Sequence, residues 1–212
     1  MPSLRQLLDA HHPLLVIDAA SSHTQIGWFP SSDPGAARWA LSDDESGIGV
    51  FRCVADLGAD LSAVGAFVFC DGPGSILGIR TTAVAIRTWN VLARRPVFSY
   101  RSLALVAHAL GRAEVGVIAD ARRETWHHYR IGGTCVRLPT AELAGELVTP
   151  ANFRHWSQLP AGVRSVPYTI AELLPMLADL DLFHINESPD AFLHEDPTYV
   201  TWTPQVHRAP SR

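Results

Sequence analysis

The sequence contains no lysine, and all 17 of its basic residues are arginine. This absence excludes mechanisms that need a lysine amine, such as Schiff-base catalysis, the Ser-x-x-Lys acyl enzymes and the phosphate-binding loop built around a lysine. Kinases and ATPases that place a lysine charge on their phosphates are excluded for the same reason.

Cysteine and positive charge are scarce too. Cys53, Cys70 and Cys135 are far apart and form no Cys-x-x-Cys pair. We therefore expect free thiols, with neither a disulfide framework nor a thiolate zinc site. The formal charge is −4 and there is no basic run, which argues against tight, autonomous binding of nucleic acid. A local basic patch would still help a partner to hold RNA.

Long apolar segments are also missing. The run at 14–17 is far too short to span a bilayer, and residues 1–12 are polar and mixed, unlike a signal peptide. Of the 212 residues, 47% are hydrophobic and 18% charged. These values predict a globular protein, which we expect to be soluble and cytoplasmic, without a membrane partner.

Motifs for metal binding and hydrolysis are absent as well. His127 and His128 are neighbours in a predicted strand, so their side chains point to opposite faces and cannot bind one metal ion. The sequence has neither a His-Glu-x-x-His helix nor a Gly-x-Ser-x-Gly elbow. We therefore expect no metal ion and no cofactor.

Strand and helix patterns alternate through the first half of the chain. The apolar runs 14–19 and 64–70 predict buried strands, and residues 24–29 form a hairpin with the first of them. Helical spacing of apolar residues predicts a helix over 46–57, capped by Ser46, and another over 77–92. The remaining elements are strands at 38–41 and 96–98 and a helix at 102–110.

A second, poorer copy of this pattern follows Gly111. Strands are predicted at 115–119, 124–131 and 135–138, a short helix at 140–147, an irregular stretch at 149–167 and a helix at 170–182. Pro175 must lie near the first turn of that last helix or kink it, and the tail from Asp196 is expected to be extended. We predict a two-lobed α/β protein, with a first lobe at 1–110 and a second, degenerate lobe at 111–212.

The glycine-rich loop at 71–78 joins a buried strand to a helix. Its glycines, Gly72, Gly74 and Gly78, have a spacing one residue longer than the dinucleotide fingerprint. Backbone N–H groups at such a junction can bind an anion, although Asp71 would repel a phosphate. The alternative is a tight structural turn in which glycine provides positive φ and close approach to the helix, and the spacing favours this alternative.

Asp18 ends the first strand, where an aspartate can hold a magnesium–nucleotide complex. Such sites place a glycine next, so that the backbone can approach phosphate, but here Ala19 and Ala20 follow. A turn-capping role beside Ser21 therefore fits better.

The segment 120–123, Asp-Ala-Arg-Arg, follows another predicted strand but lacks the glycine of a second phosphate clamp. Arg122 and Arg123 are interpreted as a solvated face, with a phosphate site as the alternative. The helix 77–92 has more apolar surface than one core-facing stripe needs. It is either enclosed between a sheet and a neighbouring helix or presents a face to a partner protein.

Three segments resemble the TsaB/YeaZ family, bacterial accessory proteins of threonylcarbamoyladenosine biosynthesis in transfer RNA. They are Val-Ile-Asp-Ala-Ala-Ser-Ser at 16–22, Cys-Asp-Gly-Pro-Gly-Ser-Ile-Leu-Gly-Ile-Arg at 70–80 and Ala-Asp-Ala-Arg-Arg-Glu at 119–124. Gly-Pro-Gly-Ser followed by Gly-x-Arg is the most specific element. The order and separation of the segments match over most of residues 14–130.

The resemblance implies an actin/Hsp70/sugar-kinase-like (ASKHA) fold of two ribonuclease-H-like lobes, the second degenerate. It implies a non-catalytic subunit that supports threonylcarbamoyl transfer to adenosine in tRNA by pairing with a TsaD-like transferase. A TsaE-like ATPase would join the assembly, and the chain would contact tRNA only indirectly. We expect pairing through the helices of the first lobe, and a homodimer would form through the same helices. The expected contact residues are Ser46, Val50, Phe51, Val54, Leu57, Ile79, Ala83 and Ile86. A vestigial nucleotide site or structural loop is expected at Asp18, Ser21, Gly72, Gly74, Ser75, Gly78 and Arg80.

The sequence departs from the family pattern in two places. The family helix that matches 46–57 usually begins His-Ser, whereas Glu45 to Gly49 reads Glu-Ser-Gly-Ile-Gly, and Asp71 replaces a glycine. These changes leave the identity of the partner open. Two other functions remain as alternatives: an ASKHA-type small-molecule kinase or ATP-binding protein, favoured by Asp18 and the glycine loop, and a peptidase, which has no motif here.

Overall fold

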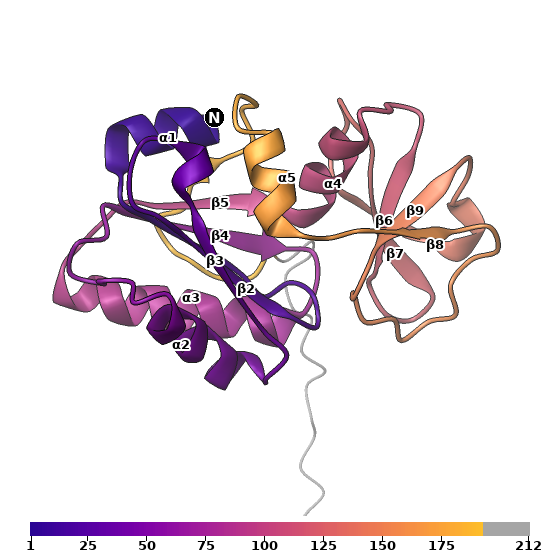
Figure 1. Cartoon of the computed structure of the whole chain (residues 1–212). Coiled ribbons are helices and arrows are strands. Elements are labelled where there is room, and N and C mark those ends of the chain that lie inside the picture. The colour runs from indigo at the N-terminus through magenta and orange to yellow at the C-terminus, as the bar shows by residue number, and fades with distance from the viewer. Residues whose placement is uncertain (193–212) are drawn as a thin grey trace, which may run out of the picture.

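The computed structural model describes residues 1–192, which form two mixed β-sheets (Figure 1). The strands of the first sheet are β1 (Leu14–Asp18), β2 (Thr24–Phe29), β3 (Arg38–Ser42), β4 (Ala66–Gly72), β5 (Val97–Arg101) and β11 (His184–Ile185). Their order in space is β11-β5-β4-β1-β2-β3. We call this sheet and the elements packed on it the first lobe.

Burial on both faces explains the apolar runs in the centre of the first sheet. β1 and β4 are parallel, with Leu14 opposite Ala66, and every residue of both strands is buried. Strands covered on both faces are apolar along their whole length. β2 forms the predicted antiparallel hairpin with β1, and β3 is the edge strand beyond it.

Helices cover the first sheet on both sides. α2 (Ser46–Asp56) and α3 (Ile76–Leu92) lie together on one face, and α1 (Leu4–His11) and α5 (Ile170–Met176) lie on the opposite side (Figure 1). α4 (Ser102–Leu110) contacts β4 and β5 of the first sheet as well as β6 (Gly116–Asp120), the first strand of the second sheet. The helix α4 therefore packs on both sheets.

The helix α1 was not predicted from the sequence. Ser3 and Gln6 form a capping box at its start, and Leu4, Leu7 and Leu8 bury one side of it. A serine followed three residues later by glutamine, ahead of an apolar stripe, is a recognised start of a helix. The sequence therefore contains the signal for this helix.

The second sheet contains β6, β7 (Thr125–Tyr129), β8 (Val136–Pro139), β9 (Leu147–Pro150) and β10 (Arg164–Val166), in the order β10-β9-β6-β7-β8. The predicted helix at 140–147 is wrong: a single 3-10 turn at Thr140–Glu142 leads into β9, whose residues are all buried. Gly145 has φ +83° in that connection, which a helix does not allow. β10 lies in the stretch that was predicted to be irregular.

The last described part of the chain returns to the first lobe. α5 ends at Met176 rather than at residue 182, and Pro175 lies near its C-terminal end. β11 then pairs with β5, with His184 opposite Ser99. The chain passes from the first sheet to the second between β5 and β6, and residues from α5 onward pack on the first lobe again. The tail predicted from Asp196 lies outside the described residues.

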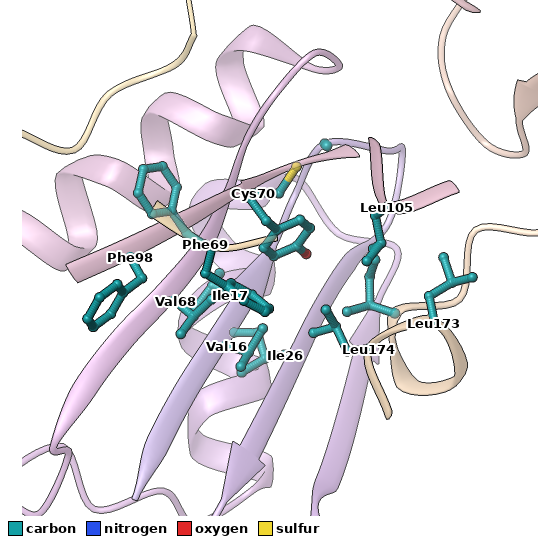
Figure 2. Packing of buried hydrophobic residues seen from close by; sticks show 14 of the residues in the cluster. Val16, Ile17, Ile26, Val68, Phe69, Cys70, Phe98, Leu105, Leu173 and Leu174 are labelled. Carbon is teal, nitrogen blue, oxygen red and sulfur yellow. The ribbon is translucent and has the colours of Figure 1, made fainter. Parts of the chain in front are cut away.

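The main hydrophobic core reflects this return of the chain. Leu105 of α4 and Leu173 and Leu174 of α5 lie close to the residues of the central strands (Figure 2). From the second sheet, Val117 of β6 and Val148 of β9 also belong to this core, and Ile118, Trp126 and Leu147 form a small separate cluster. We call the second sheet and the loops that connect its strands the second lobe, which is the smaller packing unit.

The free thiols predicted at Cys53, Cys70 and Cys135 are confirmed. None of the helices in residues 1–192 has the length and apolar content that crossing a membrane requires. The same residues contain no group of three histidine, cysteine or acidic side chains arranged to hold a metal ion.

Candidate functional site

The glycine-rich loop packs tightly against the end of β1. A Cβ atom at Gly74 would lie 2.4 Å from the carbonyl oxygen of Ala20, and one at Gly78 would lie 2.2 Å from that of Ala19. The N–H of Ser75 also donates to the oxygen of Ala20 at 2.7 Å. These glycines are required for close backbone packing, and the loop covers the turn where a phosphate-binding protein would keep open space.

Ser75 has a second role as the cap of α3. Its Oγ accepts a hydrogen bond from the N–H of Gly78 at 3.3 Å, an arrangement typical of helix starts. Ser46, by contrast, does not cap α2: Glu45 occupies the cap position and forms no side-chain cap hydrogen bond. The predicted cap at Ser46 is therefore wrong by one residue.

Asp18 is completely buried and fully engaged by the chain itself. Its Oδ2 accepts hydrogen bonds from the hydroxyl groups of Tyr100 (2.6 Å) and Tyr168 (2.7 Å), and its Oδ1 accepts one from the N–H of Ala20 (3.0 Å). Burial raises the pKa of Asp18 above its usual value, although these hydrogen bonds act in the opposite direction. The carboxylate joins three segments of the chain and has no surface for a metal–nucleotide complex.

Ser21 confirms the turn-capping interpretation of this region. Its Oγ accepts from the N–H of His23 at 3.2 Å and donates to the carbonyl oxygen of the same residue at 3.1 Å. Such side-chain-to-backbone contacts are typical of serine in turns. The predicted nucleotide-site residues Asp18 and Ser21 therefore serve the structure of the strand end.

Asp71, the predicted source of repulsion, is paired with a counterion. Its Oδ1 lies 3.0 Å from Nε of Arg101, and its Oδ2 accepts from Ser99 Oγ at 2.9 Å. The guanidinium of Arg101 in turn lies 3.4 Å from the ring centre of Phe192. Asp71 is buried and tied to β5, so its charge is neutralised within the first lobe rather than directed at the loop.

Ser99, His184 and Asp71 together have the composition of a hydrolase triad but not its geometry. Nε2 of His184 lies 2.9 Å from Ser99 Oγ and 3.1 Å from Asp71 Oδ2. In a working triad the nucleophile and the acid contact opposite nitrogens of the ring. Ser99 is also fully buried, so a substrate carbonyl has no access to its hydroxyl.

A pocket of about 280 Å³ lies between the two lobes. The glycine loop and the start of α3 form one wall, and the end of β6 with Arg122, Arg154 and Trp156 forms the other. Of the two arginines left open by the sequence, Arg122 lines this pocket and Arg123 does not. The pocket is the meeting point of the second and third sequence segments that resemble the TsaB/YeaZ family.

Asp120 organises the second wall of this pocket. Its Oδ2 accepts from the N–H groups of Trp156 and Ser157, both at 2.6 Å, and its Oδ1 accepts from the N–H of Arg122 at 2.5 Å. Burial acts to raise the pKa of Asp120, but the N–H groups of Ser157, Arg122 and Trp156 outweigh burial, and the pKa is lowered. The ionised carboxylate therefore connects two loops that are far apart in the sequence.

Six of the eight residues predicted for the partner interface are part of the core. They are buried under α2 and α3, against the sheet, and form the stripes Val50, Val54, Leu57 and Ile79, Ala83, Ile86. A charge at any of them would have to be buried, so acidic substitutions there would disturb folding itself. Of the other two, Phe51 is exposed on the outer side of α2 and Ser46 is half-buried.

The outer side of the same helices carries an apolar groove of about 350 Å³. Phe51 of α2 is 52% exposed, and Leu77 and Val84 of α3 are 78% and 51% exposed. Leu77, Thr81, Val84 and Thr88 recur at helical spacing along its length. Arg80, predicted beside the glycine loop, lies on this groove instead, 3.5 Å from Asp190.

Glycines in α2 and α3 bring the two helices close to their neighbours. A Cβ at Gly49 would lie 3.0 Å from Thr24 Oγ1 in β2, and one at Gly78 would lie 3.0 Å from Ser46 Oγ in α2. The departure from the family pattern at Gly49 therefore lets α2 lie near the sheet. Gly47 is exposed and has no neighbour within 4 Å of its Cβ position.

Two solved structures share this architecture. One is of an uncharacterized protein with similarity to the peptidase YeaZ from Pseudomonas aeruginosa, with a TM-score of 0.57 and 22% identity over 78% of this chain and 89% of that chain. The other is YeaZ from Pseudomonas aeruginosa, with a TM-score of 0.55 and 21% identity over the same shares, 78% and 89%. No protein-family model and no curated protein matches the sequence.

The likeness to these structures establishes the fold. The chain has the mixed α/β fold of the YeaZ structures, which is the predicted ASKHA type.

Proposed function

We propose that this chain is a TsaB/YeaZ-like accessory subunit that supports threonylcarbamoyl transfer to adenosine in tRNA by pairing with a TsaD-like transferase. The observation that carries the proposal is the apolar groove on the outer side of α2 and α3, on a protein with the YeaZ fold. A TsaE-like ATPase would join the same assembly.

The groove has the character of a docking surface. Phe51, Leu77 and Val84 expose large apolar side chains that the described chain does not cover. Contiguous exposed apolar surface is unfavourable in water and marks sites of protein association. A complementary helix or second apolar face is the occupant that would remove this surface from water, and a second copy of the chain is the expected substitute when the transferase is absent.

Three features favour an accessory role for this chain over catalysis. Asp18 is buried and occupied by Tyr100 and Tyr168, the glycine loop is packed on Ala20, and the sequence has no lysine. These features disfavour the kinase alternative, and the contacts of His184 disfavour the peptidase. Calorimetric titration with ATP and magnesium tests the kinase alternative, because micromolar binding would show a working nucleotide site.

The pairing is tested by co-purification with a TsaD-like subunit. Val84→Asp places a charge in the groove and should abolish pairing while the chain stays folded. Leu41→Asp is the matched control, because Leu41 is 61% exposed on β3. Its neighbour Ser42 faces α2, so alternation along the strand places Leu41 on the opposite side of the sheet. Pairing that survives Val84→Asp, or that Leu41→Asp also abolishes, would refute the proposed interface.

A further inference from the structure

Trp156 is unusual among the tryptophans of residues 1–192. Its exposed fraction is 65%, whereas Trp28, Trp89 and Trp126 are exposed by 9% or less and Trp39 is half-buried. Tryptophan has the largest apolar side chain, and leaving one in water is unfavourable unless something binds to it. Trp156 lies at the pocket between the lobes, on the wall that belongs to the second lobe.

The position of Trp156 is fixed rather than incidental. Its backbone N–H donates to Asp120, and the same carboxylate accepts from the N–H of Arg122. Arg122, Arg123 and Glu124 all have positive φ, at 65°, 53° and 56°. Three consecutive left-handed residues, none of them glycine, are energetically unfavourable and are kept only where the surroundings hold them. The turn places the guanidinium carbon of Arg122 5.2 Å from the centre of the Trp156 ring.

The charged groups of the pocket favour an anion. Arg122 and Arg154 both line it, and neither forms an ion pair with another residue of the described chain. The acid in the lining is Asp120, whose two oxygens are occupied by three backbone N–H groups. Glu124, in the same turn, is exposed and adds one negative charge nearby. The opposite wall, from Pro73 to Leu77, has no charged side chain.

We infer that this pocket binds one unpaired nucleotide of an RNA strand, with its base stacked on Trp156 and the adjoining phosphates on Arg122 and Arg154. An aromatic ring beside arginines is the combination that holds single-stranded nucleic acid without sequence preference. A volume of about 280 Å³ lies just below the range of small-ligand pockets, about 300–1,000 Å³, which suits a single base rather than several. The exposed ring at the rim suits a base that belongs to a longer strand better than a free small molecule, which a closed pocket would hold.

The inference rests on the proposed function and deepens it, because it gives the chain a direct contact with RNA in place of the indirect one expected from the sequence. Leu77 lines both this pocket and the apolar groove on α2 and α3. RNA in the pocket would therefore lie next to the proposed transferase. The net charge of the chain is −4, so we expect the chain alone to bind RNA weakly and the contact to add to RNA binding by the assembly.

The test is fluorescence anisotropy with a labelled single-stranded oligoribonucleotide, using the full chain at low salt. Trp156→Ala should weaken binding by about 5- to 150-fold, the range that corresponds to losing one base stack. Arg122→Ala should weaken binding and reduce the salt slope by about 0.7, as expected when one phosphate contact with a single strand is lost. Arg38→Ala, on the exposed edge strand β3, removes the same charge elsewhere and should leave both quantities unchanged.

Several outcomes would overturn the inference. One is that Trp156→Ala binds the oligonucleotide as tightly as the native chain does. Another is that the native chain binds a duplex of the same sequence as tightly as the single strand. A third is that inorganic phosphate displaces the RNA at the concentration of the oligonucleotide. The last result would indicate a small-anion site. Co-purification of Trp156→Ala with the TsaD-like subunit separates the two proposals, because this variant should pair normally. Loss of pairing in Val84→Asp with unchanged RNA binding would support both proposals.

Discussion

Two neighbouring residues of α2, Val50 and Phe51, should respond in opposite ways to the same substitution. Val50 has no exposed surface and lies against the sheet, whereas Phe51 is 52% exposed on the outer groove. Val50→Asp removes a buried side chain that contributes about 1.5–3 kcal/mol and buries a carboxyl group at a cost of several kcal/mol more. Because domains are stable by only about 5–15 kcal/mol, this variant should be largely unfolded or strongly destabilised.

Phe51→Asp should leave the fold intact. The Phe51 ring makes an edge-to-face contact with Trp89, with ring centres 6.1 Å apart, and such pairs contribute about 0.5–1.5 kcal/mol. The new carboxylate is solvated, so we expect a loss of stability below about 2 kcal/mol together with loss of the partner. Urea unfolding followed by circular dichroism, combined with co-purification, measures both effects. A folded Val50→Asp beside an unfolded Phe51→Asp would refute the assignment of the two faces.

Two further predictions concern the end of β1, where Asp18 is buried and Gly78 of α3 packs on Ala19. The pKa of Asp18 is raised in the folded state, so the contribution of this carboxyl to stability is present at low pH and is lost as the pH rises from the usual aspartate value through the raised one. Urea unfolding across that range should therefore show Asp18→Asn becoming less unfavourable relative to the native chain as pH rises, and a constant or growing difference would contradict the burial argument. Gly78→Ala should destabilise by about 1–3 kcal/mol, because its Cβ would lie 2.2 Å from the carbonyl oxygen of Ala19. Gly47→Ala, with open space around it, should be neutral or stabilising by up to about 1 kcal/mol, and equal effects of the two alanines would show that the loop is not closely packed.

The fold was predictable wherever one physical signal dominated. The apolar runs of β1 and β4 have no alternative to burial between two layers of helices, and β2 follows β1 after a polar turn. The strands β9 and β10 were missed because their residues have no clear alternation. β9 pairs with β6, which is distant in the sequence, and β10 pairs in turn with β9.

Most of the expected contact residues of α2 and α3 are buried, for a different reason. α2 and α3 each carry two apolar stripes, and periodicity shows that stripes exist without showing which one faces the sheet. Val50 and Val54 belong to the buried stripe, and Phe51 to the exposed one. The i, i+4, i+7 spacing of Leu77, Thr81 and Val84 was visible in the sequence, but only the packed sheet identifies it as the outer stripe.

The polar contacts could not be predicted from the sequence because they join distant segments. Tyr168 reaches Asp18 across 150 residues, and Trp156 reaches Asp120 across 36. No local pattern marks either pair. The sequence marks Arg122 as a strand-end cation, but its position beside Trp156 depends on the left-handed turn at Arg122 to Glu124.

The most direct test of the proposed function is reconstituted threonylcarbamoyl transfer to tRNA with a TsaD-like transferase, a TsaE-like ATPase and this chain. We expect modified adenosine to form with the native chain and with Leu41→Asp, and to be absent without the chain or with Val84→Asp. Formation of the same amount of product when the chain is omitted would contradict the account.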